Sequence, residues 1–123
     1  MPLDFNSTFL LILAYAILTW SMPAPCPKIH VIAARDMAEP PGFDSAGGMV
    51  NLIESAFPAT SEAIDYPACE GPSECGNMTY ADSVQLGTWA VATAVNRFAQ
   101  RCPKTKIILV GYSQVGNSSS FSR

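Results

Sequence analysis

Apolar residues in this chain fall into short blocks separated by turn-forming residues, with one longer periodic stretch among them. Three short runs, at residues 29–34, 61–66 and 106–110, are rich in apolar or β-branched residues and predict buried strands. Apolar residues at three- and four-residue steps predict helices over residues 45–57 and about 82–101. Because strands and helices alternate, the pattern predicts an α/β fold, a layered sheet with parallel strands.

Both predicted helices have a start signal, a stop signal and an apolar face. Ser45 is the expected cap of the first helix and Pro58 follows its end. Its expected apolar face consists of Met49, Leu52, Ile53, Ala56 and Phe57. Asp82 and Gln85 have the spacing of a capping box at the start of the second helix, and Pro103 stops it. Its expected apolar face consists of Val84, Gly87, Val91, Ala94, Val95 and Phe98.

The N-terminal region resembles a targeting segment. Residues 9–20 form an uncharged apolar run that is short for a bilayer span and right for the core of a signal peptide. Small residues and prolines follow, so we expect cleavage between Ser21 and Pro25 and treat residues 1–24 as the signal peptide. The alternative is an uncleaved membrane anchor. We therefore expect an extracellular, secreted protein with no membrane attachment after cleavage.

Composition narrows the function classes. The 123 residues fit one domain, and 49% hydrophobic against 14% charged residues excludes a disordered chain. A formal net charge of -3 without a Lys/Arg cluster excludes a phosphate-tracking nucleic-acid binder. Without a C-x-x-C pair, and with His30 as the single histidine, we expect no metal site and no cofactor.

Four cysteines in a secreted chain predict two disulfides, for which three pairings are possible. Cys69 and Cys75 bracket a turn-forming stretch and could close locally. Cys26 and Cys102 would then join the start of the mature chain to the end of the second helix.

A serine directly follows the last predicted strand. Gly111-Tyr112-Ser113-Gln114 forms most of a G-x-S-x-G nucleophile elbow, although Val115 stands where the second glycine is expected. In such a turn the serine hydroxyl is exposed, and the next backbone N–H points at the developing oxyanion. This motif predicts a serine esterase.

Further segments match one family in order: residues 26–35, 41–43, 61–69, 101–106 and 110–114 resemble the mature fungal acetylxylan esterases of the cutinase-like family. The similarity spans residues 26–114. It implies a doubly wound parallel sheet, the cutinase-like α/β hydrolase fold, of which this chain would hold the N-terminal portion. It also implies secretion, a Ser-His-Asp triad, and ester substrates on xylan or cutin.

The resemblance also assigns roles to single residues. Ser113 would be the nucleophile, and the backbone N–H groups of Gln114 and Met37 would form the oxyanion hole. Where the family has Arg-Glu-Thr, this chain has Arg35-Asp36-Met37, so the threonine hydroxyl is missing. The family's disulfides correspond to Cys26–Cys102 and Cys69–Cys75.

The family's catalytic aspartate and histidine lie well downstream of the elbow, beyond the residues of this chain. His30 lies inside the first strand, where we expect a packed histidine without a chemical role. We expect an esterase domain over residues 25–114 and an aberrant tail over residues 115–123. Because every valine codon begins with GT, the dinucleotide that opens most introns, we expect Val115 to mark a retained intron. The chain would then be an inactive fragment.

The first hypothesis is thus a secreted serine carboxylic ester hydrolase, an acetylxylan esterase whose substrate is an ester on a polysaccharide. The first alternative is a cutinase acting on a polyester, and the second is a non-catalytic, disulfide-tied module that binds a surface or glycan. The apolar strand 106–110 would form an open sheet edge, so we expect a monomer or an aggregate. Asn77-Met78-Thr79 is a sequon that predicts N-glycosylation of Asn77.

Overall fold

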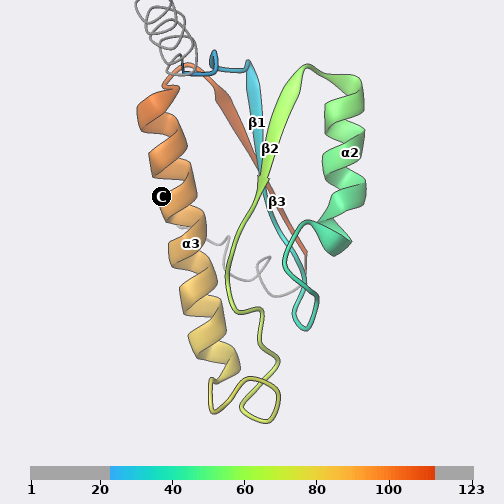
Figure 1. Cartoon of the computed structure of the whole chain (residues 1–123), viewed down its shortest axis with the longest axis vertical. Coiled ribbons are helices and arrows are strands. Elements are labelled where there is room, and N and C mark those ends of the chain that lie inside the picture. The colour runs from blue at the N-terminus through green and yellow to red at the C-terminus, as the bar shows by residue number, and fades with distance from the viewer. Residues whose placement is uncertain (1–22, 113–123) are drawn as a thin grey trace, which may run out of the picture.

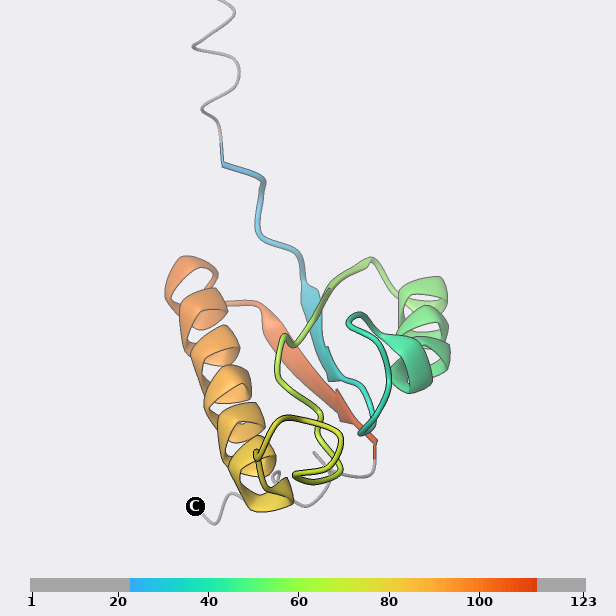
Figure 2. The same ribbon diagram turned by 60° about the horizontal axis from the view of Figure 1, so that its bottom comes forward.

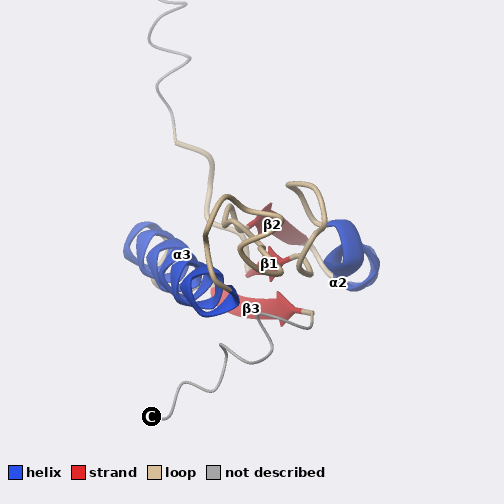
Figure 3. Ribbon diagram, turned by 90° about the horizontal axis from the view of Figure 1, so that it is seen from below, coloured by secondary structure: helices blue, strands red, loops and turns tan. Residues whose placement is uncertain are grey.

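The computed structural model describes residues 23–112. Their elements, in chain order, are β1 (Ile29–Ala34), the 3-10 turn η1 (Asp44–Ala46), α2 (Gly47–Ala56), β2 (Ala59–Ala63), α3 (Tyr80–Arg101) and β3 (Lys106–Gly111). The strands form a parallel sheet in the order β2-β1-β3. Helix α3 covers one face and α2 the other (Figure 1; Figure 3). The predicted α/β fold with parallel strands is confirmed.

The central strand β1 supplies both layers of the core, because successive side chains of a strand point to opposite faces. Ile32 and Ala34 pack with Ala94 of α3, whereas Val31 and Ala33 pack on the other face with Val50 of α2. All four β1 side chains are at most 1% exposed. The predicted bounds of this strand match the observed ones.

Strand β2 lies earlier in the chain than predicted. It pairs Ala59 with Ile29 and Ala63 with Ala33, after which the chain leaves the sheet. Ile64 and Tyr66 are buried against the sheet and α3 although they lie outside the strand. Ile64 still donates its backbone N–H to the Ala33 carbonyl of β1 at 2.8 Å, whereas the apolar character of Tyr66 reports burial in the core.

Helix α3 begins before the position the sequence predicted. Its N-cap is Thr79, whose Oγ1 accepts the backbone N–H of Asp82 at 3.1 Å, while the Asp82 carboxylate accepts the Thr79 N–H at 3.1 Å. The predicted pair of Asp82 and Gln85 is thus wrong by one turn, since Asp82 closes the capping box from its third helical position. The same contact lowers the pKa of Asp82, chiefly through its hydrogen bond with the Thr79 side chain.

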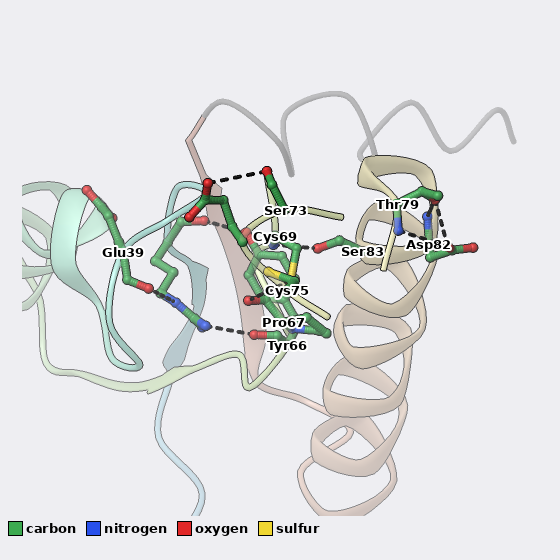
Figure 4. The surroundings of a disulfide bond; sticks show 11 residues. Glu39, Tyr66, Pro67, Cys69, Ser73, Cys75, Thr79, Asp82 and Ser83 are labelled. Carbon is green, nitrogen blue, oxygen red and sulfur yellow. Dashed lines mark hydrogen bonds between the residues drawn. A yellow bond between two sulfur atoms is a disulfide. The ribbon is translucent and has the colours of Figure 1, made fainter. Parts of the chain in front are cut away.

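The buried face of α3 largely follows the prediction. Gly87, Ala94 and Phe98 are buried, but Ser83 takes the place expected for Val84. Ser83 is 0% exposed, and its Oγ accepts the backbone N–H of Cys69 at 2.9 Å (Figure 4). A buried hydroxyl at this position satisfies a loop donor that an apolar residue would leave unpaired.

The expected apolar face of α2 is confirmed at Ile53 alone. Met49, Leu52 and Phe57 are more than half exposed, at 53%, 66% and 54%. The face on the sheet runs through the partly buried Ile53 and through Val50, which the prediction did not include. The helix follows the 3-10 turn directly with Ala46 as its N-cap, so Ser45 does not cap it.

Two disulfides close the described part of the chain, with the pairing that the resemblance implied. Cys26–Cys102 joins the segment before β1 to the end of α3, with a Cα–Cα distance of 5.5 Å. Cys69–Cys75 closes a small loop before α3, with a Cα–Cα distance of 5.9 Å (Figure 4). Across residues 23–112, no helix combines the length and apolar character that a bilayer crossing requires.

Candidate active site

The carboxyl ends of the three strands lie together at one end of the sheet, with the loops that follow β1 and β2 (Figure 1; Figure 2). Open parallel sheets bind their ligands beyond the carboxyl ends of their strands. β3 ends at Gly111, which is in register with Ala34, the last residue of β1. The chain therefore leaves β3 beside the loop that begins at Arg35. Ser113 and Gln114 lie outside the described residues, and Tyr112 before them is 59% exposed.

Arg35 is buried at the start of this loop, with 3% of its surface exposed. Its Nε donates to the Glu39 carbonyl at 2.8 Å, and its Nη2 donates to the Tyr66 carbonyl at 2.7 Å. A longer bond of 3.5 Å joins Nη1 to the Ile64 carbonyl. A buried charge needs such partners to offset lost hydration. Through them Arg35 joins the loop after β1 to the segment after β2.

Tyr66 completes this contact from the other side. Its hydroxyl donates to the Arg35 carbonyl at 2.7 Å, and the Arg35 guanidinium lies 5.0 Å from the centre of its ring. Burial, the largest cause, raises the pKa of Tyr66 above its usual value, so the phenol stays protonated and can donate. Nothing in the linear sequence links these two residues, so their contact could not be predicted from it.

The Glu39 carboxylate closes the loop at its base. It accepts the backbone N–H of Asp36 at 3.2 Å and that of Ser45 at 3.1 Å. Hydrogen bonding by Ser45 is the main reason that the pKa of Glu39 is lowered. Ala38 has a positive φ of 62° and donates its N–H to the Ala68 carbonyl at 2.8 Å. The loop is thus held at several points by groups from residues 35–68.

Met37 carries the second expected oxyanion donor. In the structure its backbone N–H donates to the Asp36 carboxylate at 2.7 Å. The side chain of the preceding residue thus occupies this donor. For Met37 to donate to a substrate, the Asp36 side chain has to turn away.

His30 is a packed histidine, as expected. It is 5% exposed and its ring stacks on Phe98 with a centroid distance of 3.7 Å. Nδ1 lies 2.7 Å from Thr60 Oγ1 and Nε2 lies 3.3 Å from the Glu62 carboxylate, which also accepts from Arg97 at 2.7 Å. As the second residue of β1, it lies toward the opposite end of the strand from the candidate site.

A family model described as Cutinase matches residues 25–119 of the chain. "Cutinase 11" of Verticillium dahliae is 59% identical over 92 residues, which cover 74% of this chain and 31% of that protein. "Acetylxylan esterase 2" of Talaromyces purpureogenus is 54% identical over 92 residues, covering 74% of this chain and 39% of that protein.

A solved structure of an acetylxylan esterase superimposes with a TM-score of 0.71 at 52% identity, covering 76% of this chain and 46% of that one. The catalytic core of the acetyl xylan esterase from Trichoderma reesei gives the same TM-score at 47% identity. The chain spans about a third to two fifths of the length of these curated relatives. The parallel sheet, the flanking helices and the sequence match together show that the chain belongs to the cutinase family of esterases.

Proposed function

We propose that residues 25–114 form the nucleophile-bearing part of a secreted serine carboxylic ester hydrolase. The observation that carries the proposal is the register of β3 with β1, which places Gly111 beside Ala34, the residue before the loop of Arg35 to Met37. In this assignment Ser113 attacks the acyl carbon. The backbone N–H groups of Gln114 and Met37 stabilise the oxyanion that forms.

The proposed substrate is an acetyl ester on a xylan polysaccharide. This choice rests on the relatives named acetylxylan esterase, one of them 54% identical to the chain and one with a superimposable structure. The second candidate is a cutin-like polyester, favoured by the relative named "Cutinase 11" at 59% identity. No cofactor takes part in either reaction, because a serine ester hydrolase uses only side chains and backbone donors.

The 123 residues by themselves are proposed to be inactive. A serine hydroxyl is a weak nucleophile without a general base. The single histidine, His30, is buried, stacked on Phe98 and hydrogen-bonded through both ring nitrogens. Loss of a triad member leaves only the residual catalysis of the oxyanion hole and binding.

A chimera tests whether residues 25–114 support catalysis when the rest of an esterase domain is supplied. Residues 25–114 would replace the matching segment of the Talaromyces purpureogenus acetylxylan esterase. We expect the chimera to release acetate from acetylated xylan, and Ser113→Ala to abolish release without changing its melting temperature. A folded chimera whose turnover does not depend on Ser113 would contradict the assignment. Comparing acetyl with long-chain p-nitrophenyl esters distinguishes the two substrate candidates.

The isolated chain supplies the complementary measurement. We expect no turnover of p-nitrophenyl acetate above that of its Ser113→Ala variant. Turnover that this variant abolishes would show that the chain holds a general base and would refute the proposed inactivity.

Secretion is proposed from the apolar run at residues 9–20 and from two disulfides, which form in oxidising compartments. N-terminal sequencing of secreted protein should find the first residue between Ser21 and Cys26. A mature protein that retains residues 1–20 would instead indicate the membrane anchor.

We also propose that the isolated chain self-associates through β3. This strand lies at one edge of the described sheet, and Leu109 on it is 52% exposed. An apolar edge with unpaired backbone groups is a template for pairing with another chain. Leu109→Lys should shift the protein toward monomer in size-exclusion chromatography. A wild-type chain that is monomeric at high concentration would refute this proposal.

A further inference from the structure

We propose that Asn77 is an N-glycosylation site and that the structure leaves it free to carry the glycan. The sequon Asn77-Met78-Thr79 lies between the Cys69–Cys75 disulfide and the first residue of α3. This connection is at the end of the molecule where the strands have their carboxyl ends (Figure 1). The glycan would therefore project from the same end as the candidate active site.

The main chain at Asn77 holds the turn without help from its side chain. Asn77 adopts a left-handed conformation with φ of 72°, which asparagine tolerates better than most residues. Its backbone N–H donates to the Pro72 carbonyl at 3.2 Å, and that of Met78 donates to the Cys75 carbonyl at 3.3 Å. The residue is exposed, and within residues 23–112 its side-chain amide has no hydrogen bond. A sugar on the amide nitrogen thus displaces no contact of the described fold.

Thr79 has a second function in the folded chain. Its Oγ1 donates to the Asp82 carboxylate at 2.6 Å and accepts the Asp82 N–H at 3.1 Å, so the hydroxyl is committed to the capping box (Figure 4). The acceptor sequence N-x-S/T needs this hydroxyl. We infer that glycan transfer precedes the closing of the first turn of α3.

The disulfide next to the sequon points to the secretory route, where N-glycosylation takes place. Cys75 is only two positions before Asn77, and its bond to Cys69 requires the oxidising conditions of the secretory route. N-linked glycans are added to chains that follow the same route. Disulfide formation and glycan addition at Asn77 would therefore take place in the same compartment.

The test is expression of the full 123-residue chain in a secreting yeast, with cells and medium analysed together so that retained protein is included. Peptide mass spectrometry after treatment with peptide-N-glycosidase F should find Asn77 converted to aspartate. Asn77→Gln should remove this modification, and Asn117→Gln, which changes another sequon of the sequence, should leave it in place.

Variants of the cap separate glycosylation from helix stability. Thr79→Ser keeps both the sequon and the capping hydroxyl, so the glycan should remain. Asp82→Ala breaks the capping box but leaves the sequon intact, and it should remain glycosylated. An Asn77 peptide recovered unmodified from the wild-type protein would overturn the proposal, as would loss of the glycan in Asp82→Ala.

Discussion

Replacing Gly87 with alanine tests the packing between α3 and the segment that supports the candidate site. A Cβ at this position would lie 2.9 Å from Tyr66 Cδ2 and 3.3 Å from Tyr66 Cε2. Atoms at these distances overlap, so either the helix or the tyrosine ring has to move. The ring cannot move freely, because its hydroxyl is bonded to the Arg35 carbonyl at 2.7 Å and Tyr66 is only 4% exposed.

Two effects of opposite sign determine how much Gly87→Ala changes the free energy of unfolding. Alanine stabilises a helix interior over glycine by about 1 kcal/mol. Overpacking a filled core costs about 1–3 kcal/mol, and a ring held at its hydroxyl favours the upper end of that range. We expect Gly87→Ala to lower the free energy of unfolding by about 2 kcal/mol. For a domain of this size, each kcal/mol corresponds to about 4–8 °C in Tm.

The assay is urea unfolding of the wild type, Gly87→Ala and a matched control. Gly48→Ala serves as the control because Gly48 lies exposed in α2 and a Cβ there meets nothing within 4 Å. It should stabilise the chain by up to about 1 kcal/mol. In a Tyr66→Leu background the cost of Gly87→Ala should shrink, which a double-mutant cycle measures. If Gly87→Ala were as stable as the wild type, or if its cost were the same without the tyrosine ring, the steric reasoning would fail.

Three further predictions address the rest of the fold. Replacing Cys26 and Cys102 with alanine should cost about 4 kcal/mol, because the disulfide closes a sequence separation of 76 residues; non-reduced peptide mapping that found Cys26 joined to Cys69 would contradict this pairing. Thr79→Ala should cost about 1 kcal/mol in urea unfolding through loss of the α3 cap, whereas Thr79→Ser should cost only a few tenths. Glu39 has a lowered pKa in the folded chain, so its contribution to the free energy of unfolding is present above the ordinary pKa of 4.5 and is lost as the pH falls below that value. Glu39→Gln should flatten this part of the profile of stability against pH. An unchanged profile would show that the loop contact does not contribute.

Elements with a strong local pattern could be predicted from the sequence. β1 is an apolar run bounded by polar residues on both sides, and α3 has a long periodic face, so their existence and approximate bounds follow from the pattern. The start of α3 was misplaced because an aspartate can serve either as the N-cap or as the third helical residue of a capping box. Asp82 was assigned to the first position and occupies the second, with Thr79 as the N-cap. α2 was misjudged because it has more apolar residues than the sheet covers, and periodicity does not show which of them face the sheet.

The contacts around the candidate site could not be predicted, because they join side chains to backbone groups that are distant in sequence. Arg35 donates to carbonyls of residues 64 and 66, and Ser83 accepts from the N–H of Cys69. Hydrogen bonds to main-chain atoms place no demand on the identity of the partner residue, so they leave no motif. The disulfide pairing was accessible through the family resemblance, since four cysteines by themselves allow three pairings. The elbow stays a prediction, because Ser113 lies outside the described residues.

The loop after β1 obtains its order from residues that precede α3. Arg35, Glu39 and Tyr66 fix its carbonyl and N–H groups, and none of these contacts involves a residue after position 68. An oxyanion donor is effective when it is positioned before the charge develops, since no reorganisation is then needed during the reaction. In the structure the Met37 N–H donates to the Asp36 carboxylate at 2.7 Å. The donor side of the proposed site is therefore organised by the described residues alone, and Asp36 becomes the group that a substrate oxygen would have to displace.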